Sequence, residues 1–355
     1  MKIVLILGAG ATVSDVATRP LKVRPPLDKR FFSIAKHTNS SLADDVARYM
    51  RSVYAVDIMH DDEDSLEKVM GRIYTDMFNP ALEKRATDAF RALLSLFTRR
   101  LASTTNDIEP TNRRWLYRIL AHYLSNGSTP SDITIITFNQ DLQVEKTLCL
   151  MSGVARWRRY SAELFNFPGL YCLGERETTL PTDKSPVELF DIAPPLDGCV
   201  KVLKLHGSLN WYSTHKSPQP PPTAMFKPSR KLRVTRRRII VPQMTYTHQR
   251  RTHALPVVVP PVTHKSAVLH DDVRQIWRLA EESLNDADEL LIFGYSCPPL
   301  DFESANQLQR SQRKSKTSKI SVIDPNGAIA ARYIELLHPN SLNYFSSAKA
   351  FLDDR

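Results

Sequence analysis

Six short apolar segments, rich in β-branched residues, constrain the fold of this 355-residue chain more than any other feature. Their apolar residues are near-continuous rather than alternating, a pattern typical of parallel strands that are buried on both faces. The six lie at 2–7, 132–137, 200–205, 238–242, 289–294 and 319–324. Helical patterns separate several of them, and the one at 270–288 carries five apolar residues at helical spacing. This alternation predicts an α/β fold, with a mostly parallel sheet and helices on both of its faces.

The segment 30–127 differs, because its patterning is helical throughout. It carries four amphipathic stretches, and Asp64 or Ser65 is expected to cap the second of them. Since 355 residues exceed what one compact core usually needs, we predict an all-helical insertion here, serving as a lid or an oligomer contact. The sheet domain would then comprise residues 1–29 and 128–355.

Composition and cysteine usage argue against several classes of protein. Hydrophobic residues make up 42% and charged residues 24%, as in ordinary globular proteins, and no apolar run is long enough to span a bilayer. The start, MKIVLILGAGA, imitates a short signal peptide, but its apolar part is short and two glycines come directly after it. We therefore interpret it as a buried strand, and predict a cytoplasmic protein without membrane contact. The four cysteines lie far apart without a C-x-x-C pair, which argues against a zinc site and predicts that no metal is bound.

The net charge of +10 is concentrated in part in two basic segments. Lys227–Arg238 has seven basic residues and no acidic one, and Arg310–Lys319 is the second run. Such a segment either contacts an acidic partner or nucleic acid, or is a solvated loop. Neither run carries the interleaved aromatic residues of a base-stacking surface. The proline-rich stretch 217–231 is predicted to be an exposed loop.

The first predicted strand ends in LGAGAT, which places a glycine loop at its carboxyl end. Glycines there let the backbone approach a ligand and turn N–H groups toward a phosphate, as in Rossmann-like nucleotide-binding sheets. The G-x-G-x-x-G pattern is incomplete, because Val13 stands where the third glycine would be, so the loop is equally consistent with a tight turn into a helix. Arg24, Pro25 and Pro26 occupy the region where dehydrogenases carry an acidic residue, which argues against hydride transfer.

Polar residues follow four of the other predicted strands, at the point where each of these strands ends. Asn139 and Asp141 follow the second strand and His206 follows the third. The segment FGYSCPPLD, which includes Asp301, follows the fifth strand, and VIDPN follows the sixth. Asn139 alone is equally a turn residue or a helix cap, and His206 alone is equally a core histidine. Because the carboxyl ends of parallel strands meet at one edge of a sheet, these residues are expected to form a common rim around a ligand.

In this combination the motifs resemble the sirtuin-like family, and most closely its bacterial NAD-hydrolase branch, which is associated with antiphage defence. The resemblance covers nearly the whole chain, and the motifs occur in the family's order, although none of them is specific alone. They are LGAGAT at 7–12, TFNQD at 137–141, LKLHGSLNW at 203–211, VVVPPVTHKS at 257–266, FGYSCPPLD at 293–301 and VIDPN at 322–326.

The resemblance implies a role for each of these residues toward NAD. His206 would be the catalytic base, Asn139 would hold the nicotinamide-side ribose or the attacking water, and Asp141 would help to position the nicotinamide end. The remaining residues would bind the pyrophosphate, the adenine ribose or the adenosine end of NAD. They are Gly8, Ala9, Gly10, Ala11 and Thr12 in the glycine loop, Gly294 and Ser296 after the fifth strand, and Asp324 and Asn326 after the sixth.

Departures from the family bear on the expected activity. The segment 28–33, DKRFFS, does not match the proline-aspartate-phenylalanine-arginine stretch of sirtuin deacylases, and their four-cysteine zinc module is absent. Both departures put protein deacylation in doubt. Thr12 and Gln140 stand where the hydrolase branch more commonly has serine and tyrosine, but neither change removes a group that the chemistry requires.

Cleavage of the nicotinamide–ribose bond needs few protein groups. Nicotinamide leaves without protonation through an oxocarbenium-like transition state, so the site needs a held ribose, a nucleophile and one base. Together with this chemistry, the resemblance implies an NAD+ glycohydrolase that acts in bacterial antiviral defence by NAD depletion, as a homo-oligomer or with a partner protein of a defence system. Two alternatives stay open: an NAD-dependent deacylase or ADP-ribosyltransferase, and a non-catalytic subunit that senses NAD or ADP-ribose and docks on a partner through Lys227–Arg238.

Overall fold

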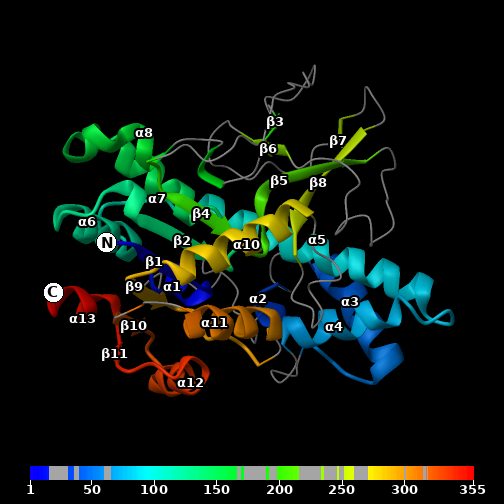
Figure 1. The fold of residues 1–355 in the computed structure, drawn as a ribbon. Helices are drawn as coiled ribbons and strands as arrows, with labels where there is room; N and C mark the ends of the chain where they lie inside the picture. Colours follow the sequence, from blue (N-terminus) through cyan, green and yellow to red (C-terminus); the bar gives the residue numbers. More distant parts are fainter. Residues whose placement is uncertain are drawn as a thin grey trace.

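The structure of the chain is a computed structural model (Figure 1), and the residues that it describes fall in fourteen ranges. They are 1–15, 31–35, 40–59, 65–165, 169–171, 189–191, 198–215, 233–235, 246–247, 252–259, 271–299, 301–314, 317 and 319–355. The predicted strand at 238–242 and the predicted loop at 217–231 lie outside these residues. Of the basic segment Lys227–Arg238, only β6 (Arg233–Thr235) is described.

The main sheet consists of six parallel strands in the order β11-β10-β9-β1-β2-β4. In chain order these are β1 (Ile3–Leu7), β2 (Ile133–Thr137), β4 (Lys201–Lys204), β9 (Glu289–Phe293), β10 (Lys319–Ile323) and β11 (Leu342–Phe345). β1 pairs with β2 on one side and with β9 on the other, so the chain runs outward in both directions from the β1–β9 pair. This is the strand order of doubly wound dinucleotide-binding sheets, and it confirms the predicted α/β, Rossmann-like fold.

Five of the six predicted strands belong to this sheet, each within one residue of its predicted ends. β11 is missing from the sequence prediction. It lies at the edge of the sheet, and its residues Asn343 and Tyr344 are exposed, so the segment lacks the continuous apolar run of the buried strands.

Helices cover both faces of the main sheet, as the sequence predicts (Figure 1). One contacting group consists of α1 (Ala9–Asp15), α6 (Trp115–Ser125), α7 (Gln143–Ser152) and α13 (Ala348–Asp353). The other consists of α10 (Asp271–Asn285), α11 (Phe302–Lys314) and α12 (Gly327–Leu337). β1 and β9 are buried along their whole length, as expected of central strands covered from both sides.

The described residues between β1 and β2 are mostly helical. Before α6 it contains α2 (Phe31–Ala35), α3 (Ser40–Tyr54), α4 (Leu66–Asp76) and α5 (Glu83–Asp107). α3 and α4 both pack against α5, on the opposite side of Figure 1 from α13. Ser65 caps α4, because its side chain accepts a hydrogen bond from the N–H of Lys68 (3.1 Å). α6 also lies within the predicted insertion 30–127, yet it contacts α1, α7 and α13 and is one of the helices that cover the sheet.

A second, antiparallel sheet, which the sequence analysis does not predict, follows directly from the main one. Its strand order is β3-β6-β5-β8-β7, with β3 (Leu189–Asp191), β5 (Gly207–His215), β7 (Tyr246–Thr247) and β8 (Thr252–Val258) joining β6. β4 ends at Lys204, Leu205 and His206 form a turn, and β5 begins at Gly207. The φ of Gly207 is 74°, which a glycine adopts readily. The break in the pattern after His206 is therefore the passage from one sheet to the other.

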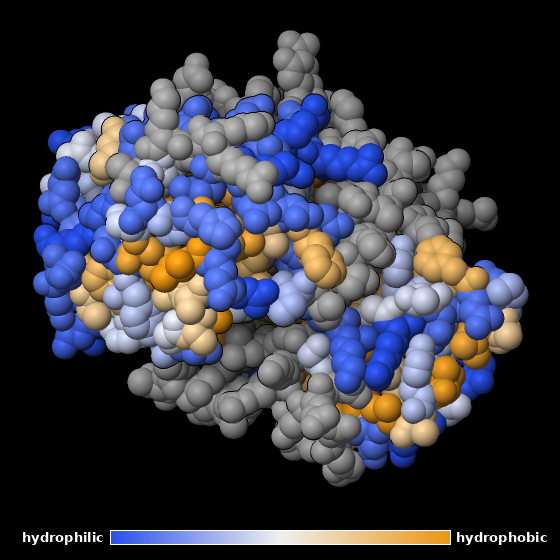
Figure 2. Space-filling view, turned by 60° about the horizontal axis from the view of Figure 1, so that its bottom comes forward, coloured by the Kyte–Doolittle hydropathy of each residue, from blue (hydrophilic) through white to orange (hydrophobic). Residues whose placement is uncertain are grey.

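The remaining helical segments among the described residues are short: η3 (Pro130–Asp132), η4 (Ala155–Tyr160), α8 (Ser161–Leu164) and η5 (Gly169–Tyr171). In the described part of the chain, no helix is both long and apolar enough to cross a bilayer. Figure 2 shows hydrophobic residues emerging at separate places on one face, among hydrophilic ones. The large hydrophobic side chains that are exposed in the described residues are Met1, Phe78, Phe302, Ile334 and Tyr344.

Candidate active site

The carboxyl ends of β1 and β9 are in direct backbone contact. The N–H of Gly8 donates to Phe293 O (3.1 Å), and the N–H of Gly10 donates to Gly294 O (2.9 Å). A side chain would not fit here, since a Cβ on Gly8 would lie 2.5 Å from Gly294 O and one on Gly294 would lie 2.2 Å from Ala11 N. Gly294 also has a φ of 61°, in the left-handed region. Close approach of the two strand ends therefore requires these glycines.

The same contact bears on the predicted phosphate-binding role of the glycine loop. The N–H groups of Gly8, Gly10 and Ala11 all donate to main-chain oxygens, that of Ala11 to Gly8 O (3.0 Å). They are therefore engaged inside the protein. Ala9 is exposed and Thr12 is buried. A pyrophosphate contact by the loop stays a prediction, and Ala9 is the part of the loop that is open to it.

Asn139, beyond the end of β2, reaches back to the glycine loop. Its Nδ2 donates to Gly8 O (2.9 Å) and to Thr12 Oγ1 (3.2 Å). Thr12 Oγ1 in turn donates to Asp141 Oδ2 (2.9 Å). Residues predicted from two distant segments thus form one hydrogen-bonded cluster. No described residue donates to the side-chain oxygen of Asn139, so that oxygen is the atom left to accept from a ligand or a water.

Asp141 is buried, and both of its carboxylate oxygens are engaged. Oδ1 accepts from the N–H of Gln143 (3.0 Å) at the start of α7, so Asp141 rather than Asn139 satisfies the first turn of that helix. Burial raises the pKa of Asp141 above its ordinary value, while the nearby ammonium group of Lys204 acts in the opposite direction. Lys204 donates to the main-chain oxygen of Asp141 and to Glu145 Oε1 (2.9 Å), which puts an ion pair in the core behind the cluster.

A second carboxylate, Asp15, lies at the end of α1. Its Oδ1 accepts from the N–H of Trp115 (2.6 Å) at the start of α6, and Arg114 donates to its main-chain oxygen. Burial raises the pKa of Asp15 to about 6, and the charge of Asp141 adds a smaller effect in the same direction. Sequence patterning gives no sign of this residue, because the contact joins helices that are far apart in the chain.

His206 lies in the turn between β4 and β5 and is buried. Its Nε2 is 3.7 Å from Asp301 Oδ2, and its ring meets the edge of Phe138 with a centroid separation of 5.2 Å. Its main-chain oxygen accepts from the N–H of Val259 (2.8 Å), at the end of β8. The ring therefore faces a carboxylate as well as an aromatic side chain, and is not surrounded by apolar groups alone.

The strand register puts Asn139 and His206 at the same level of the sheet edge. β2 and β4 are neighbours, and Thr137 pairs with Lys204, so each of the two predicted catalytic residues follows its paired residue by two positions. Phe138, between Thr137 and Asn139, touches the ring of His206. The structure thus brings both residues to the carboxyl edge, beside the point where the strand order reverses.

Four residues at or near His206 are not among the residues assigned a role toward NAD. Phe138 stacks on Tyr295 at a centroid separation of 3.9 Å and an angle of 11°. Tyr295 Oη donates to Asp301 Oδ2 (3.0 Å), and Ser304 Oγ donates to Asp301 Oδ1 (2.7 Å). In the sequence Asp301 stands out only as part of the motif FGYSCPPLD, since nothing there pairs it with His206.

The residues predicted for the adenosine end lie along the same edge. Gly294 touches the glycine loop, and Ser296 is exposed. Asp324 Oδ1 accepts from the N–H of Asn326 (2.9 Å), and Asn326 Oδ1 caps α12 by accepting from Ala328 N (3.1 Å). Burial raises the pKa of the half-buried Asp324. The predicted rim is therefore continuous along β4, β2, β1, β9 and β10.

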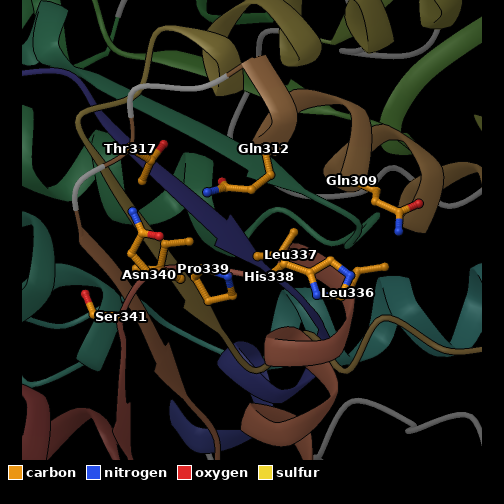
Figure 3. Close-up of a pocket in the computed structure, with 10 residues that line it drawn as sticks. Gln309, Gln312, Thr317, Leu336, Leu337, His338, Pro339, Asn340 and Ser341 are labelled. Atoms are coloured by element: carbon orange, nitrogen blue, oxygen red, sulfur yellow. The ribbon is translucent and has the colours of Figure 1, made fainter.

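A cavity of ≈ 340 Å³ lies at the other end of the sheet (Figure 3). Among its lining residues are Gln309 and Gln312 of α11, Thr317, which precedes β10, and His338 and Ser341, which precede β11. Because it is at the amino ends of these strands, this cavity is separate from the rim and contains none of the predicted site residues. Its walls are mostly uncharged, and we assign it no role in the chemistry.

In the residues that the structure describes, no group of three or more His, Cys, Asp or Glu side chains is arranged to hold a metal ion. The expectation of metal-free chemistry stays a prediction. No family model matches the chain, and no curated protein matches it. The function is therefore inferred from the fold, the site geometry and the motif resemblance.

Proposed function

We propose that this protein is an NAD+ glycohydrolase that cleaves the nicotinamide–ribose bond and releases nicotinamide and ADP-ribose. The observation that carries the proposal is the placement of Asn139 and His206 at one level of the carboxyl edge. This edge borders the crevice in which doubly wound sheets bind dinucleotides. His206 is the base and Asn139 holds the nucleophile or the ribose.

The chemistry follows from these two side chains. The oxygen of a water attacks the anomeric carbon, the bond to the pyridinium nitrogen breaks, and its electron pair neutralises the departing nicotinamide. The proton of the water passes to the imidazole of His206, which suits this role because imidazole titrates near neutral pH. Asn139 is held through Nδ2 by Gly8 and Thr12, so its oxygen is fixed to accept a hydrogen bond from the water or from a ribose hydroxyl.

Aromatic packing supports the same proposal. The stacked rings of Phe138 and Tyr295 form an apolar wall next to His206. Such a wall limits access of bulk water and strengthens electrostatic interactions at the reacting centre. The motif resemblance supports a biological role in bacterial antiviral defence by NAD depletion, in a homo-oligomer or with a partner protein. Asp141 and the glycine loop would then shape the nicotinamide and pyrophosphate subsites.

The test compares the rates at which the purified protein and its His206→Ala variant release nicotinamide from NAD, as measured by chromatography. We expect the variant to lose roughly 10²–10⁴-fold in turnover, the usual contribution of a general base, while circular dichroism stays unchanged. His338→Asn is the matched control, since this exposed histidine lies away from the rim and its φ of 47° suits asparagine. Equal turnover in the wild type and His206→Ala would refute the role of His206.

The alternative activities give different outcomes in the same assay. Nicotinamide release that requires an acetylated peptide would indicate a deacylase, and transfer of ADP-ribose to protein would indicate a transferase. Binding of NAD without any cleavage would indicate a sensing subunit. Release from NAD alone, in the absence of peptide, is the result that the proposed hydrolase requires.

A further inference from the structure

We propose that Asp301 is the positioning residue for His206: its carboxylate holds the imidazole with Nε2 protonated, so that Nδ1 is the atom that takes the proton from the nucleophile. This inference rests on the proposed function, because it assigns a geometry to the same base. It concerns a residue that would not touch the substrate and would act through His206.

The first support is the orientation of the pair. Of the two ring nitrogens, Nε2 is the one found 3.7 Å from Asp301 Oδ2. Both residues are buried, with 8% of His206 and 2% of Asp301 exposed, so the attraction between them is weakly screened by solvent. Phe138 contacts the ring as well, which restricts its rotation.

The second support is that the carboxylate is itself fixed. Each carboxylate oxygen accepts a hydrogen bond from a hydroxyl group, Oδ2 from Tyr295 (3.0 Å) and Oδ1 from Ser304 (2.7 Å). Asp301 immediately precedes α11, and its main-chain oxygen accepts from Ala305 N (3.1 Å) in the first turn of that helix. The N-terminal end of a helix favours a negative charge. Burial, together with the charge of Asp301, keeps the pKa of Tyr295 well above its ordinary value, so its hydroxyl remains a donor.

The chemical consequence is a defined tautomer. At 3.7 Å from Nε2 the Asp301 carboxylate acts through its charge: it favours the tautomer with the proton on Nε2 and the lone pair on Nδ1, and it stabilises the imidazolium that forms when Nδ1 takes a proton. The proton later leaves Nδ1 to solvent, and the dyad returns to its starting state. An amide at position 301 would present an N–H as well as an oxygen, and would therefore permit the wrong tautomer.

The experiment combines kinetics with spectroscopy on the full chain. We expect Asp301→Asn to lower kcat about 10²-fold, as for a misplaced catalytic group, with KM changed by no more than about threefold. Asp301→Glu should recover part of the loss. The ¹⁵N chemical shifts of the His206 ring, assigned by comparison with His206→Ala, should show Nε2 protonation in the wild type and a changed tautomer ratio in Asp301→Asn.

Asp76→Asn is the matched control. The Asp76 carboxylate also accepts two hydroxyls, from Tyr49 (2.8 Å) and Tyr54 (2.6 Å), but it lies between α3 and α4, away from His206. It should leave kcat and the His206 shifts unchanged. If Asp301→Asn turned over NAD like the wild type, or if its His206 tautomer were unaltered, the inference would be wrong while the hydrolase proposal stood.

A different result would separate the two proposals. If the wild type released no nicotinamide, the hydrolase proposal would fail, yet the ¹⁵N shifts would still decide whether Asp301 sets the His206 tautomer. If Asp301→Asn failed to fold, Tyr295→Phe and Ser304→Ala would replace it, since each removes one hydroxyl from the carboxylate. Each should then lower kcat, and unchanged kcat in both would overturn the inference.

Discussion

Asp141 and Asp301 are two buried carboxylates at the same sheet edge, and they are held in different ways. The Asp141 oxygens accept from Thr12 and from a backbone N–H, and the ion pair of Lys204 and Glu145 lies behind it. The Asp301 oxygens accept from two hydroxyls and face the ring of His206. The first arrangement stabilises the joint between β1 and β2. The second leaves a charge directed at the group that we propose to react, so Asp301 should act on turnover through His206, whereas Asp141 should act through the position of Asn139.

The greatest loss of stability should come from the buried ion pair behind Asp141. Lys204→Met removes the ammonium group from a fully buried pair and leaves the Glu145 carboxylate uncompensated, so we expect a loss of about 3–5 kcal/mol in the free energy of unfolding. Urea unfolding followed by fluorescence measures it. Lys319→Met is the control: this lysine is 43% exposed and 4.0 Å from Glu289, so its loss should cost about 0–1 kcal/mol. Similar values for the two variants would show that the buried pair is not important to stability.

The next prediction concerns the pH dependence of stability near Asp141. The pKa of Asp15, beside Asp141, is raised by burial from an ordinary value of 3.8 to about 6. The folded state therefore favours the protonated carboxyl, and this contribution to stability is complete below pH 3.8 and lost as the pH rises through about 6. Over that window the wild type should lose up to about 1.4 kcal/mol per pH unit relative to Asp15→Asn.

Denaturant unfolding of the wild type and Asp15→Asn between pH 4 and pH 7 checks this expectation. Asparagine keeps an oxygen to accept the Trp115 N–H, so the variant retains the helix contact without the charge. A stability difference that stays constant with pH would contradict the assigned burial effect.

The smallest effects come from single hydroxyls. Thr12→Val and Ser304→Ala each remove one donor from a buried carboxylate, and each should cost about 0.5–1.5 kcal/mol in the free energy of unfolding. Their denaturation midpoints should therefore be similar. If Ser304→Ala were far more destabilising than Thr12→Val, Asp301 would have a structural role larger than its position next to His206 suggests.

The main sheet was predictable because its central strands are buried on both faces and therefore carry uninterrupted apolar runs. β11 was not, since an edge strand with exposed Asn343 and Tyr344 carries no such run. The second sheet was missed because β3 and β6 have three residues each and β7 has two, which is too few to show a periodic pattern. The helical spacing of apolar residues was enough to predict α4, with Ser65 as one of two candidate N-caps.

In the candidate site, too, some residues could be predicted from the sequence and others could not. Residues at strand ends were predictable, because parallel strands place them at one edge, and Asn139, Thr12 and Asp141 do meet there. The partner of His206 was not, since contact with Asp301 depends on how the turn after β9 folds back over the sheet. The sequence predicts the glycine loop as a ligand contact, whereas its Gly8 and Gly10 are needed first for backbone packing against Gly294.

The turn that carries His206 is fastened to both sheets. Leu205 N–H donates to Thr137 O in the main sheet (3.0 Å), and His206 O accepts from Val259 at the end of β8 (2.8 Å). The main chain that carries the imidazole is therefore bonded to the parallel sheet on one side and to the antiparallel sheet on the other. A rotation of one sheet relative to the other would therefore change the backbone at Leu205–Gly207, and with it the orientation of the His206 ring.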